Sequence, residues 1–296
     1  MEVIRFDGYT TDEKLAIARD YLWPRQVERN GLLPDDVAID ADVLRYVITN
    51  YTREAGVRQL ERDLGTVLRR TAARVASGDQ PKPIVIDTAA VLLALKRPRF
   101  HQEVAARTGV PGVATGLAVT GAGGDVLFVE AASMAGKSGL VLTGQLGDVM
   151  KESARIALTY VQSHAPELGI EPAAFEGREF HVHVPAGAIP KDGPSAGVTM
   201  VAALTSLLTG RPLKRTVGMT GEVTLQGRVL PIGGLKQKVL AAHAAGLTEV
   251  ILPERNAVDL DDVPPDVREH MQFHAVKSAD EMLALALEPR AMAAAA

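Results

Sequence analysis

A serine in a turn shaped by glycine and proline is the first feature of the sequence that could do chemistry. Ser195 stands in the segment PKDGPSAG, residues 190–197, with a strand-like run at 178–185 before it and an apolar helical pattern at 195–209 after it. A serine that opens a helix is held out from the backbone, and nearby N–H groups could receive a developing oxyanion. An isolated serine at this position would be an ordinary helix N-cap. The nucleophile hypothesis therefore depends on the whole segment.

A serine hydroxyl is a weak nucleophile and needs a base. The segment LPIGGLKQK, residues 230–238, predicts a turn and then a helix that carries two lysines. At about 100° per residue, Lys236 and Lys238 lie on nearly opposite faces of that helix. An apolar face removes water from an amine and lowers its pKa from about 10.4 toward neutrality. The alternative is a surface lysine that snorkels. The face of Lys238 is the apolar one, because it carries Leu235, Ala241 and Ala242.

The elements that must position these two segments alternate between strand and helix. Strand-like runs are predicted at 114–120, 125–132, 139–143, 178–185, 222–230, 248–252 and 270–276. Helical patterns are predicted at 146–164, 195–209, 234–245, 255–261 and 279–287. Four small residues at 121–124 would form a hairpin turn. This mixture predicts an α/β or α+β domain.

Residues 1–80 have helical patterns throughout. Thr10 and Glu13 form a capping box at the start of the first helix. Pro24 should end or kink that helix, because proline lacks the N–H that a helix interior needs. Asp40 could cap a second helix.

A longer amphipathic run at 53–76, closed by Gly78, follows that second helix. A short β-like run at 84–86 and a helix at 88–95 come next.

The character of the sequence changes near residues 98–110, where prolines and glycines interrupt the helical patterns. We predict a small helical domain at 1–98, a linker at 99–110, a mixed α/β domain at 111–288 and a frayed tail at 289–296. The predicted fold class is α+β.

The composition is that of a globular protein, with 47% hydrophobic and 23% charged residues. Aromatic residues make up only 4% and the net charge is −4, which argues against a nucleic-acid binder. The sequence has no cysteine, so disulfides, thiol nucleophiles and cysteine-bound zinc are excluded. We find neither a signal peptide nor an apolar membrane span and expect a cytoplasmic protein.

The segments PKDGPSAG, MTGE (219–222) and LPIGGLKQK together resemble the proteolytic domain of Lon proteases. In that family the serine of the first segment is the nucleophile, which corresponds to Ser195. The second lysine of the last segment is the general base, which corresponds to Lys238. The resemblance also implies that Thr220 hydrogen-bonds the catalytic lysine and that Glu130 and Asp192 support the site. Each of these three has an ordinary alternative, as a polar residue at a strand end or as a surface carboxylate.

The front of the chain, at 8–26 and 50–62, resembles the small helical domain that follows the nucleotide-binding core in Lon. The resemblance implies that Arg58 is a sensor arginine that reaches nucleotide phosphate in the full-length protein. It also implies hexameric rings and unfolded or damaged proteins as substrates. A boronate that becomes tetrahedral on Ser195 would mimic the intermediate of hydrolysis, so peptide boronates should inhibit. We expect ATP and Mg²⁺ to serve the full-length protein, and no cofactor to serve this chain.

Two segments imitate other sites. Residues 135–138, AGKS, match the end of a phosphate-binding loop, but position 131 is alanine where that loop needs glycine. We predict a strand connection there and infer that the ATPase core is missing, so that the sequence begins in the middle of a longer protein. His181 and His183 alternate on a strand and could share a metal, but a third ligand is not evident.

Two other functions compete with peptide hydrolysis. The chain could be a non-catalytic assembly or substrate-binding module of the same ring protein, which a peptidase assay with Ser195→Ala as control would decide. The arginines at 53–75 could bind nucleic acid, although acidic residues are interleaved with them. Salt-dependent binding would test that alternative.

Overall fold

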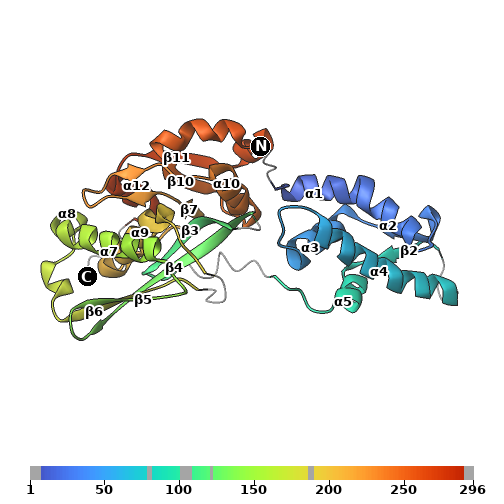
Figure 1. Cartoon of the computed structure of the whole chain (residues 1–296), viewed down its shortest axis with the longest axis horizontal. Coiled ribbons are helices and arrows are strands. Elements are labelled where there is room, and N and C mark those ends of the chain that lie inside the picture. The colour runs from blue at the N-terminus through green and yellow to red at the C-terminus, as the bar shows by residue number, and fades with distance from the viewer. Residues whose placement is uncertain (1–7, 79–81, 101–108, 121–122, 186–189, 290–296) are drawn as a thin grey trace, which may run out of the picture. The chain divides into compact units, whose positions relative to one another are not determined.

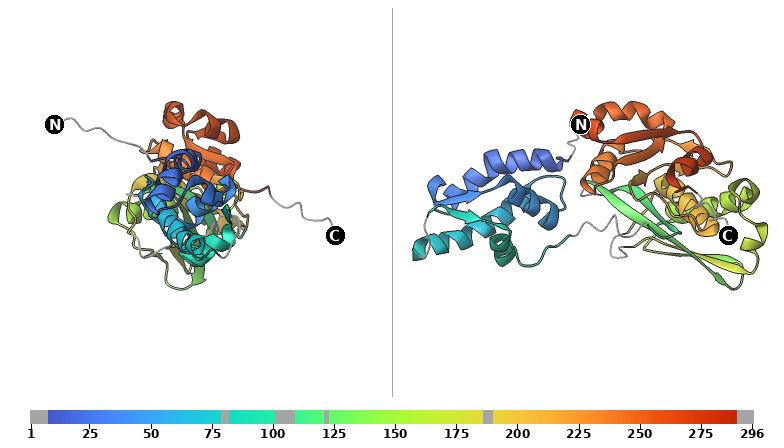
Figure 2. Two further views of the ribbon diagram at one scale, coloured as in Figure 1. Left: turned by 90° about the vertical axis from the view of Figure 1, so that its right-hand side faces the viewer. Right: turned by 180° about the vertical axis from the view of Figure 1, so that it is seen from behind.

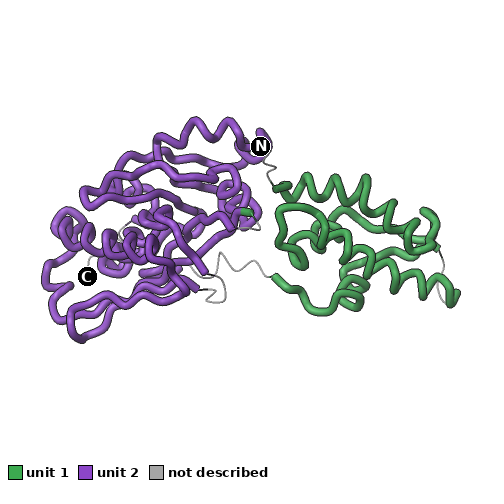
Figure 3. The backbone as a smooth tube through the Cα atoms, viewed as in Figure 1, with its two compact units in different colours: residues 1–102, 121–123 green, residues 103–120, 124–296 purple. Residues whose placement is uncertain are grey.

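The computed structural model describes residues 8–78, 82–100, 109–120, 123–185 and 190–289. The chain divides into two compact units, residues 1–102 with 121–123 and residues 103–120 with 124–296 (Figures 1 and 3). We refer to them as unit 1 and unit 2. The predicted α+β class is confirmed. Most of the predicted linker, 99–110, and nearly all of the predicted tail, 289–296, lie outside the described residues.

Unit 1 opens with three consecutive helical segments: α1 (Thr11–Ile17), a π-helical turn η1 (Ala18–Leu22) and α2 (Trp23–Arg29). The capping box is present, because Thr10 and Glu13 exchange side-chain to backbone hydrogen bonds. The prediction that the helix ends at Pro24 was wrong, because α2 continues to Arg29. The backbone widens into the π-helical turn just before Pro24, so the proline ring falls in the first turn of α2, where a missing N–H is tolerated.

The helices α3 (Ala41–Tyr51), α4 (Arg58–Ser77) and α5 (Thr88–Leu95) complete the helical part of unit 1. Asp40 is the N-cap residue of α3, and α4 ends at Gly78, whose φ of 70° is left-handed. Their apolar stripes form a common core that includes Leu44, Val47, Leu60, Leu64 and Leu68.

Unit 1 is not purely helical, which corrects the prediction for residues 1–80. After a short 3₁₀ turn η2 (Pro34–Asp36), strand β1 (Val37–Ile39) pairs in parallel with β2 (Ile84–Ile86). Three residues are too few for a periodic pattern, and the partner strand is distant in sequence. Only the β2 half of this pair was therefore recognisable from the sequence.

Among the described residues of unit 2, seven strands form one sheet in the order β11-β10-β7-β3-β4-β6-β5 (Figures 1 and 2). In chain order these strands are β3 (Val113–Thr120), β4 (Gly123–Ala135), β5 (Gly139–Thr143), β6 (Arg178–His183), β7 (Val217–Met219), β10 (Glu249–Pro253) and β11 (Gln272–Val276). Strand β6 is antiparallel to β4, whereas β10 is parallel to both β7 and β11. The sheet is therefore mixed.

Two hydrophobic cores cover the two faces of this sheet. Along β10, Ile251 belongs to one core, whereas Val250 and Leu252 belong to the other, as expected from the alternation of side chains along a strand. The first core contains α7 (Asp148–Ser163), α9 (Gly197–Thr209) and α12 (Ala279–Ala286). The second contains α10 (Leu235–Ala244) and α11 (Pro265–His270).

Short elements complete unit 2. They are α8 (Ala165–Leu168), η3 (Pro172–Phe175), η4 (Pro194–Ala196), β8 (Glu222–Val223), β9 (Val229–Leu230) and η5 (Glu254–Asp262). The predicted strand at 222–230 is instead the hairpin β8–β9, because Gly227 turns the chain with a φ of 76°. The predicted α-helix at 255–261 is the 3₁₀ helix η5. The sequence prediction missed β7, α8, η3 and α11.

The predicted hairpin turn at 121–124 joins β3 and β4, which are neighbours in the sheet. Residues 121–122 of this turn lie outside the described part of the chain. Within the described ranges, no helix has the length and apolar character needed to cross a membrane.

Candidate active site

Ser195 lies in the short 3₁₀ turn η4, which runs directly into α9. Gly193 precedes this turn with a φ of 127°, a conformation that residues with a Cβ rarely adopt. The serine is half-buried, whereas Ala196 and Gly197 after it are buried. The turn and the packed start of α9 therefore fix the serine backbone at the helix N-terminus.

Backbone hydrogen bonds join this turn to the segment that follows β7. The Gly221 N–H donates to the Ser195 carbonyl at 2.9 Å, and the Val198 N–H donates to the Gly221 carbonyl at 3.1 Å. A Cβ on Gly197 would lie 3.0 Å from Val223, and one on Gly221 would lie 3.0 Å from Val198. The two glycines let the two backbones approach closely.

Thr220 and Lys238 meet in the buried interior beside this junction. The Lys238 amine on α10 donates to the Thr220 hydroxyl at 2.8 Å, and that hydroxyl donates to the Ser195 carbonyl at 3.4 Å. Thr220 is 1% exposed and Lys238 is 2% exposed. The structure thus brings together three residues that are far apart in sequence.

Burial changes the chemistry of the Lys238 amine. Removal of water lowers the pKa of Lys238 from its ordinary 10.5 to about 8. Lys236, two residues earlier on the same helix, is only half-buried. The packing partners predicted for Lys238 on its own face include Leu235 and Ala242, which are 3% and 0% exposed. The helix-face argument selected the buried lysine.

The hydrogen bond with Thr220 does not occupy the lone pair of the Lys238 amine, so the amine can still accept a proton. A threonine hydroxyl has one hydrogen, which here points to the Ser195 carbonyl, and it accepts one N–H from Lys238. A neutral lysine that donates to Thr220 keeps its lone pair. Within the described residues the Ser195 hydroxyl has no hydrogen-bond partner, so its proton is not committed elsewhere.

Comparison with known proteins identifies the family. Residues 85–289 match the Lon protease (S16) C-terminal proteolytic domain, and residues 28–84 match the Lon protease AAA+ ATPase lid domain. The chain belongs to the Lon protease family. The Lon protease of Salinispora arenicola is 62% identical over 289 residues, and that of Mycolicibacterium smegmatis is 58% identical over 289 residues. Each alignment covers 98% of this chain but 37% of the relative. The chain therefore spans little more than a third of these two relatives.

In this Lon chain the side chain of Asp192 hydrogen-bonds the start of α7 and not Lys238. Its Oδ1 accepts hydrogen bonds from the backbone N–H groups of Met150, at 3.0 Å, and Gly193, at 2.9 Å. A Cβ on Gly147, the N-cap residue of α7, would lie 2.2 Å from the Asp192 carboxyl carbon. Asp192 therefore acts as a capping group that ties the serine turn to the N-terminus of α7.

Glu130 and the two histidines lie on the neighbouring strands β4 and β6 of the Lon sheet. Glu130 on β4 is paired with His183 on β6, and His181 and His183 both contact the Thr143 hydroxyl, at 2.9 and 2.7 Å. Within the described residues, Glu130 makes no hydrogen bond to Ser195, Thr220 or Lys238. The same residues hold no group of three or more potential ligands suited to a metal ion.

The remaining predicted residues belong to other elements of the chain. Arg58 is the exposed first residue of α4 in unit 1, the unit that contains the whole Lon lid match. Residues 136–138 connect β4 to β5, so the AGKS segment is a strand connection, as predicted. A phosphate cradle would need these residues to open a helix.

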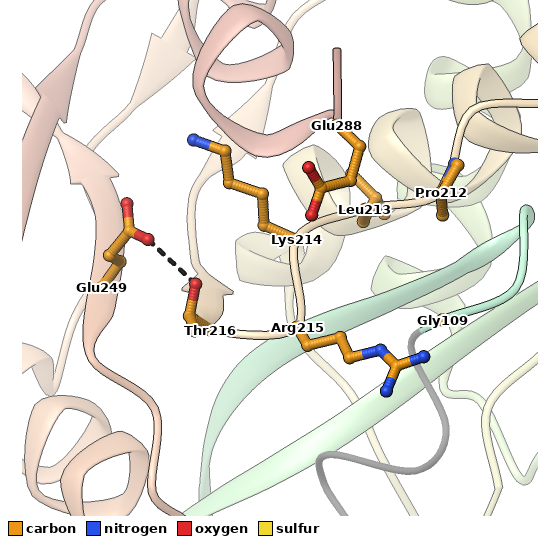
Figure 4. Close-up of a pocket in the computed structure, with 8 residues that line it drawn as sticks. All are labelled: Gly109, Pro212, Leu213, Lys214, Arg215, Thr216, Glu249 and Glu288. Atoms are coloured by element: carbon orange, nitrogen blue, oxygen red, sulfur yellow. Dashed lines mark hydrogen bonds between the residues drawn. The ribbon is translucent and has the colours of Figure 1, made fainter. Parts of the chain in front are cut away.

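A cavity of about 540 Å³ in unit 2 does not include the proposed dyad. Its lining mixes polar and apolar residues, among them Glu249 and Leu213, and the side chains of Lys214 and Arg215 extend in different directions (Figure 4). The Glu249 carboxylate accepts a hydrogen bond from Thr216 at 2.9 Å and pairs with His274 at 3.0 Å. Burial raises the pKa of Glu249, but these two hydrogen bonds, together with the charges of Lys214 and His274, leave the pKa below its usual value.

Sequence reasoning missed two residues next to the Lon site. Asn256 is 4% exposed and hydrogen-bonds the turn in front of α10. Gly124 on β4 lies so close to α10 that a Cβ would be 1.9 Å from the Gln237 carbonyl oxygen. A polar residue three positions after strand β10 was the available signal for Asn256, whereas Gly124 looked like part of a turn.

Proposed function

We propose that this chain carries the peptide-hydrolysing site of an ATP-dependent Lon protease, with Ser195 as nucleophile and Lys238 as general base. The observation that supports this most strongly is the hydrogen-bonded link from the Lys238 amine through Thr220 to the Ser195 backbone. The lowered pKa of the lysine and the family match support the same chemistry. Thr220 is the residue that positions the base.

The first chemical step is proton transfer from Ser195 to Lys238. With a pKa of about 8, roughly one lysine in ten is neutral at pH 7, compared with about three in ten thousand at the ordinary value. The lone pair of the neutral amine accepts the proton as the serine oxygen attacks the peptide carbonyl carbon. Burial thus supplies several hundred times more of the active form at neutral pH.

The attack produces a tetrahedral intermediate with a negatively charged oxygen. The N-terminus of α9 follows Ser195 directly, so backbone N–H groups and the positive end of the helix dipole can stabilise that charge. The protonated Lys238 then gives its proton to the leaving amine, and an acyl-enzyme ester on Ser195 remains. Water hydrolyses this ester with Lys238 again acting as base. A peptide boronate that becomes tetrahedral on Ser195 should inhibit the reaction.

The wider Lon activity requires residues that this chain does not have. The sequence contains no G-x-x-x-x-G-K-[ST] segment, and AGKS connects two strands, so these residues do not fit a nucleotide. ATP and Mg²⁺ belong to the full-length protein, which we propose assembles as a cytoplasmic hexameric ring and degrades unfolded or damaged proteins. The isolated chain should cut short or unstructured polypeptides slowly and without ATP.

Supporting roles complete the proposal. Asp192 holds the serine turn against α7, and Glu130 contributes acidic charge from β4 without direct contact to the dyad. Arg58 senses nucleotide in the full-length protein from a lid domain at 1–98. This lid is followed by a linker at 99–110, the proteolytic domain at 111–288 and a tail at 289–296.

The test is hydrolysis of a fluorogenic peptide and of an unfolded protein by the purified chain. Ser195→Ala and Lys238→Ala should each abolish cleavage, whereas Lys236→Ala, a lysine removed from the same helix, should leave it unchanged. Native mass measurement of each variant checks that assembly is unaltered. Substantial cleavage by a clean Lys238→Ala preparation would exclude the dyad, and cleavage absent from all folded preparations would favour a non-catalytic assembly module.

A further inference from the structure

Asn256 is a buried side chain whose amide pairs with one residue of a surface turn. Its Oδ1 accepts a hydrogen bond from the Ile232 N–H at 2.9 Å, and its Nδ2 donates to the Ile232 carbonyl at 2.9 Å. The second Nδ2 hydrogen goes to Asp259 at 2.6 Å. Because both backbone groups of one residue are matched, the amide binds Ile232 as a neighbouring strand would.

The turn that Asn256 holds determines where α10 begins. Ile232 lies between β9 and α10, and the helix N-cap is Gly234, whose φ is 70°. The Lys238 N–H donates to the Gly234 carbonyl at 3.2 Å, so the lysine lies in the first turn of the helix. Pro231, Gly233 and Gly234 are exposed. Ile232 itself is partly buried against the core around α10, so Asn256 fixes the turn together with that packing.

The same stretch of chain also holds Thr220. Asn256 follows strand β10 by three residues, and the carbonyl of Ile251 on β10 accepts the Thr220 N–H at 3.0 Å. Ile251 is 0% exposed in the packed interior of the sheet. One continuous segment, residues 251–256, therefore contacts the threonine directly and the start of the lysine helix through Ile232.

We propose that Asn256 is a positioning residue that keeps the Lys238 amine in register with Thr220 and Ser195. It contacts none of the reacting atoms and acts only through the start of α10. This inference rests on the Ser195–Lys238 mechanism proposed above. Misplacement of a catalytic group by about 1 Å can reduce a rate about a hundredfold. Loss of the Ile232 pairing should therefore reduce turnover much more than substrate binding.

Aspartate has nearly the volume of asparagine, so Asn256→Asp tests the pairing with Ile232 while the size of the side chain stays the same. The Asn256→Asp variant keeps an acceptor for the Ile232 N–H but has no donor for the Ile232 carbonyl, and its new charge faces the acidic Asp259. Asn256→Ser removes the pairing without adding a charge. Asp259→Asn is the matched control, because it removes the neighbouring charge and leaves both Ile232 hydrogen bonds intact.

The experiment measures kcat and KM on a fluorogenic peptide from pH 6 to 10 for the full chain and these variants. Circular dichroism gives the folded fraction of each, and rates are corrected for it. We expect kcat to fall about 30- to 100-fold in Asn256→Asp and Asn256→Ser, with KM within about threefold of the parent. The apparent pKa of the base should also shift in both. Asp259→Asn should stay within about threefold of the parent in both constants.

The positioning role is overturned if either Asn256 variant retains the parent kcat and pH profile per folded molecule. It is also overturned if the loss is explained fully by a smaller folded fraction. Ser195→Ala in the same assay separates this failure from failure of the proposed function. Activity in Ser195→Ala would contradict the Ser–Lys mechanism itself, whereas an inactive Ser195→Ala beside a fully active Asn256→Ser contradicts only the inference about Asn256.

Discussion

Replacing Lys238 by methionine should abolish hydrolysis and at the same time make the protein more stable at neutral pH. Methionine has a similar length and no charge, and it is well suited to irregular apolar surroundings. The substitution removes a cation from a site that is 2% exposed. Catalysis and stability therefore place opposite demands on this residue.

The magnitude follows from the pKa of Lys238, which is about 8 in the folded protein and 10.5 ordinarily. At pH 7 both the folded and the unfolded protein are protonated at this site, and the buried charge costs roughly 3 kcal/mol. Between pH 8 and 10.5 the unfolded chain holds more protons than the folded one, so wild-type stability rises with pH. At pH 10 the remaining cost is about 1 kcal/mol.

The lost hydrogen bond to Thr220 offsets part of the gain. A buried hydrogen bond of this kind contributes about 1 kcal/mol net. Lys238→Met should therefore exceed the parent by about 2 kcal/mol in free energy of unfolding at pH 7 and equal it at pH 10.

Urea unfolding of the parent and of Lys238→Met, followed by far-ultraviolet circular dichroism at pH 7 and pH 10, measures this difference. Trp23 is the only tryptophan of the sequence and lies in unit 1, so its fluorescence reports a part of the chain that the substitution should not affect. Ser195→Ala is the matched control, because it removes no charge and its effect should not depend on pH. A difference between Lys238→Met and the parent that is the same at both pH values would refute the reasoning, because the amine would then not be desolvated.

The pH dependence of kcat/KM should rise to a plateau with an apparent pKa near 8, which a peptide assay from pH 6 to 10 would measure; a midpoint near 10.5 would contradict the burial argument. Thr220→Ala should reduce kcat at least tenfold, whereas Thr220→Ser keeps the hydroxyl and should retain most of the parent kcat. Equal rates in the two variants would count against a positioning role. Asp192→Ala should lower the free energy of unfolding by about 1 kcal/mol in urea titrations, because α7 loses its cap. Asp192→Asn keeps an acceptor oxygen and should lose less. Gly124→Ala should reduce activity more than a hundredfold in the same peptide assay, because its Cβ would displace α10. A folded, fully active variant would show that α10 can move freely.

The sequence was sufficient where a local pattern determines the geometry. The choice between Lys236 and Lys238 followed from helix periodicity alone, and the structure buries Lys238 and leaves Lys236 half-buried. The serine turn was recognisable because Gly193 and Pro194 restrict the backbone in front of a helix. The helix at 88–95 and the strand at 139–143 were predicted with the bounds that the structure has.

Contacts between distant segments could not be predicted from the residues alone. The link from Thr220 to Lys238 requires that β7 lie between β3 and β10, and β7 has only three residues in an apolar stretch. The pairing of Asn256 with Ile232 similarly joins one segment that precedes α10 in the sequence to another that follows it. For Asp192 the sequence indicated a carboxylate near the serine but not that it caps α7.

Close approach of backbones brings together the segments around the buried amine. Gly124, Gly197 and Gly221 each stand where a Cβ would come within 3.0 Å of a neighbouring segment. This fits a sequence with only 4% aromatic residues, which has few large side chains available to exclude water. The pKa of Lys238 is then a property of the spacing between β4, α9, α10 and the segment after β7. Any change that separates these elements readmits water, raises the pKa toward 10.5 and removes the neutral amine that the reaction needs.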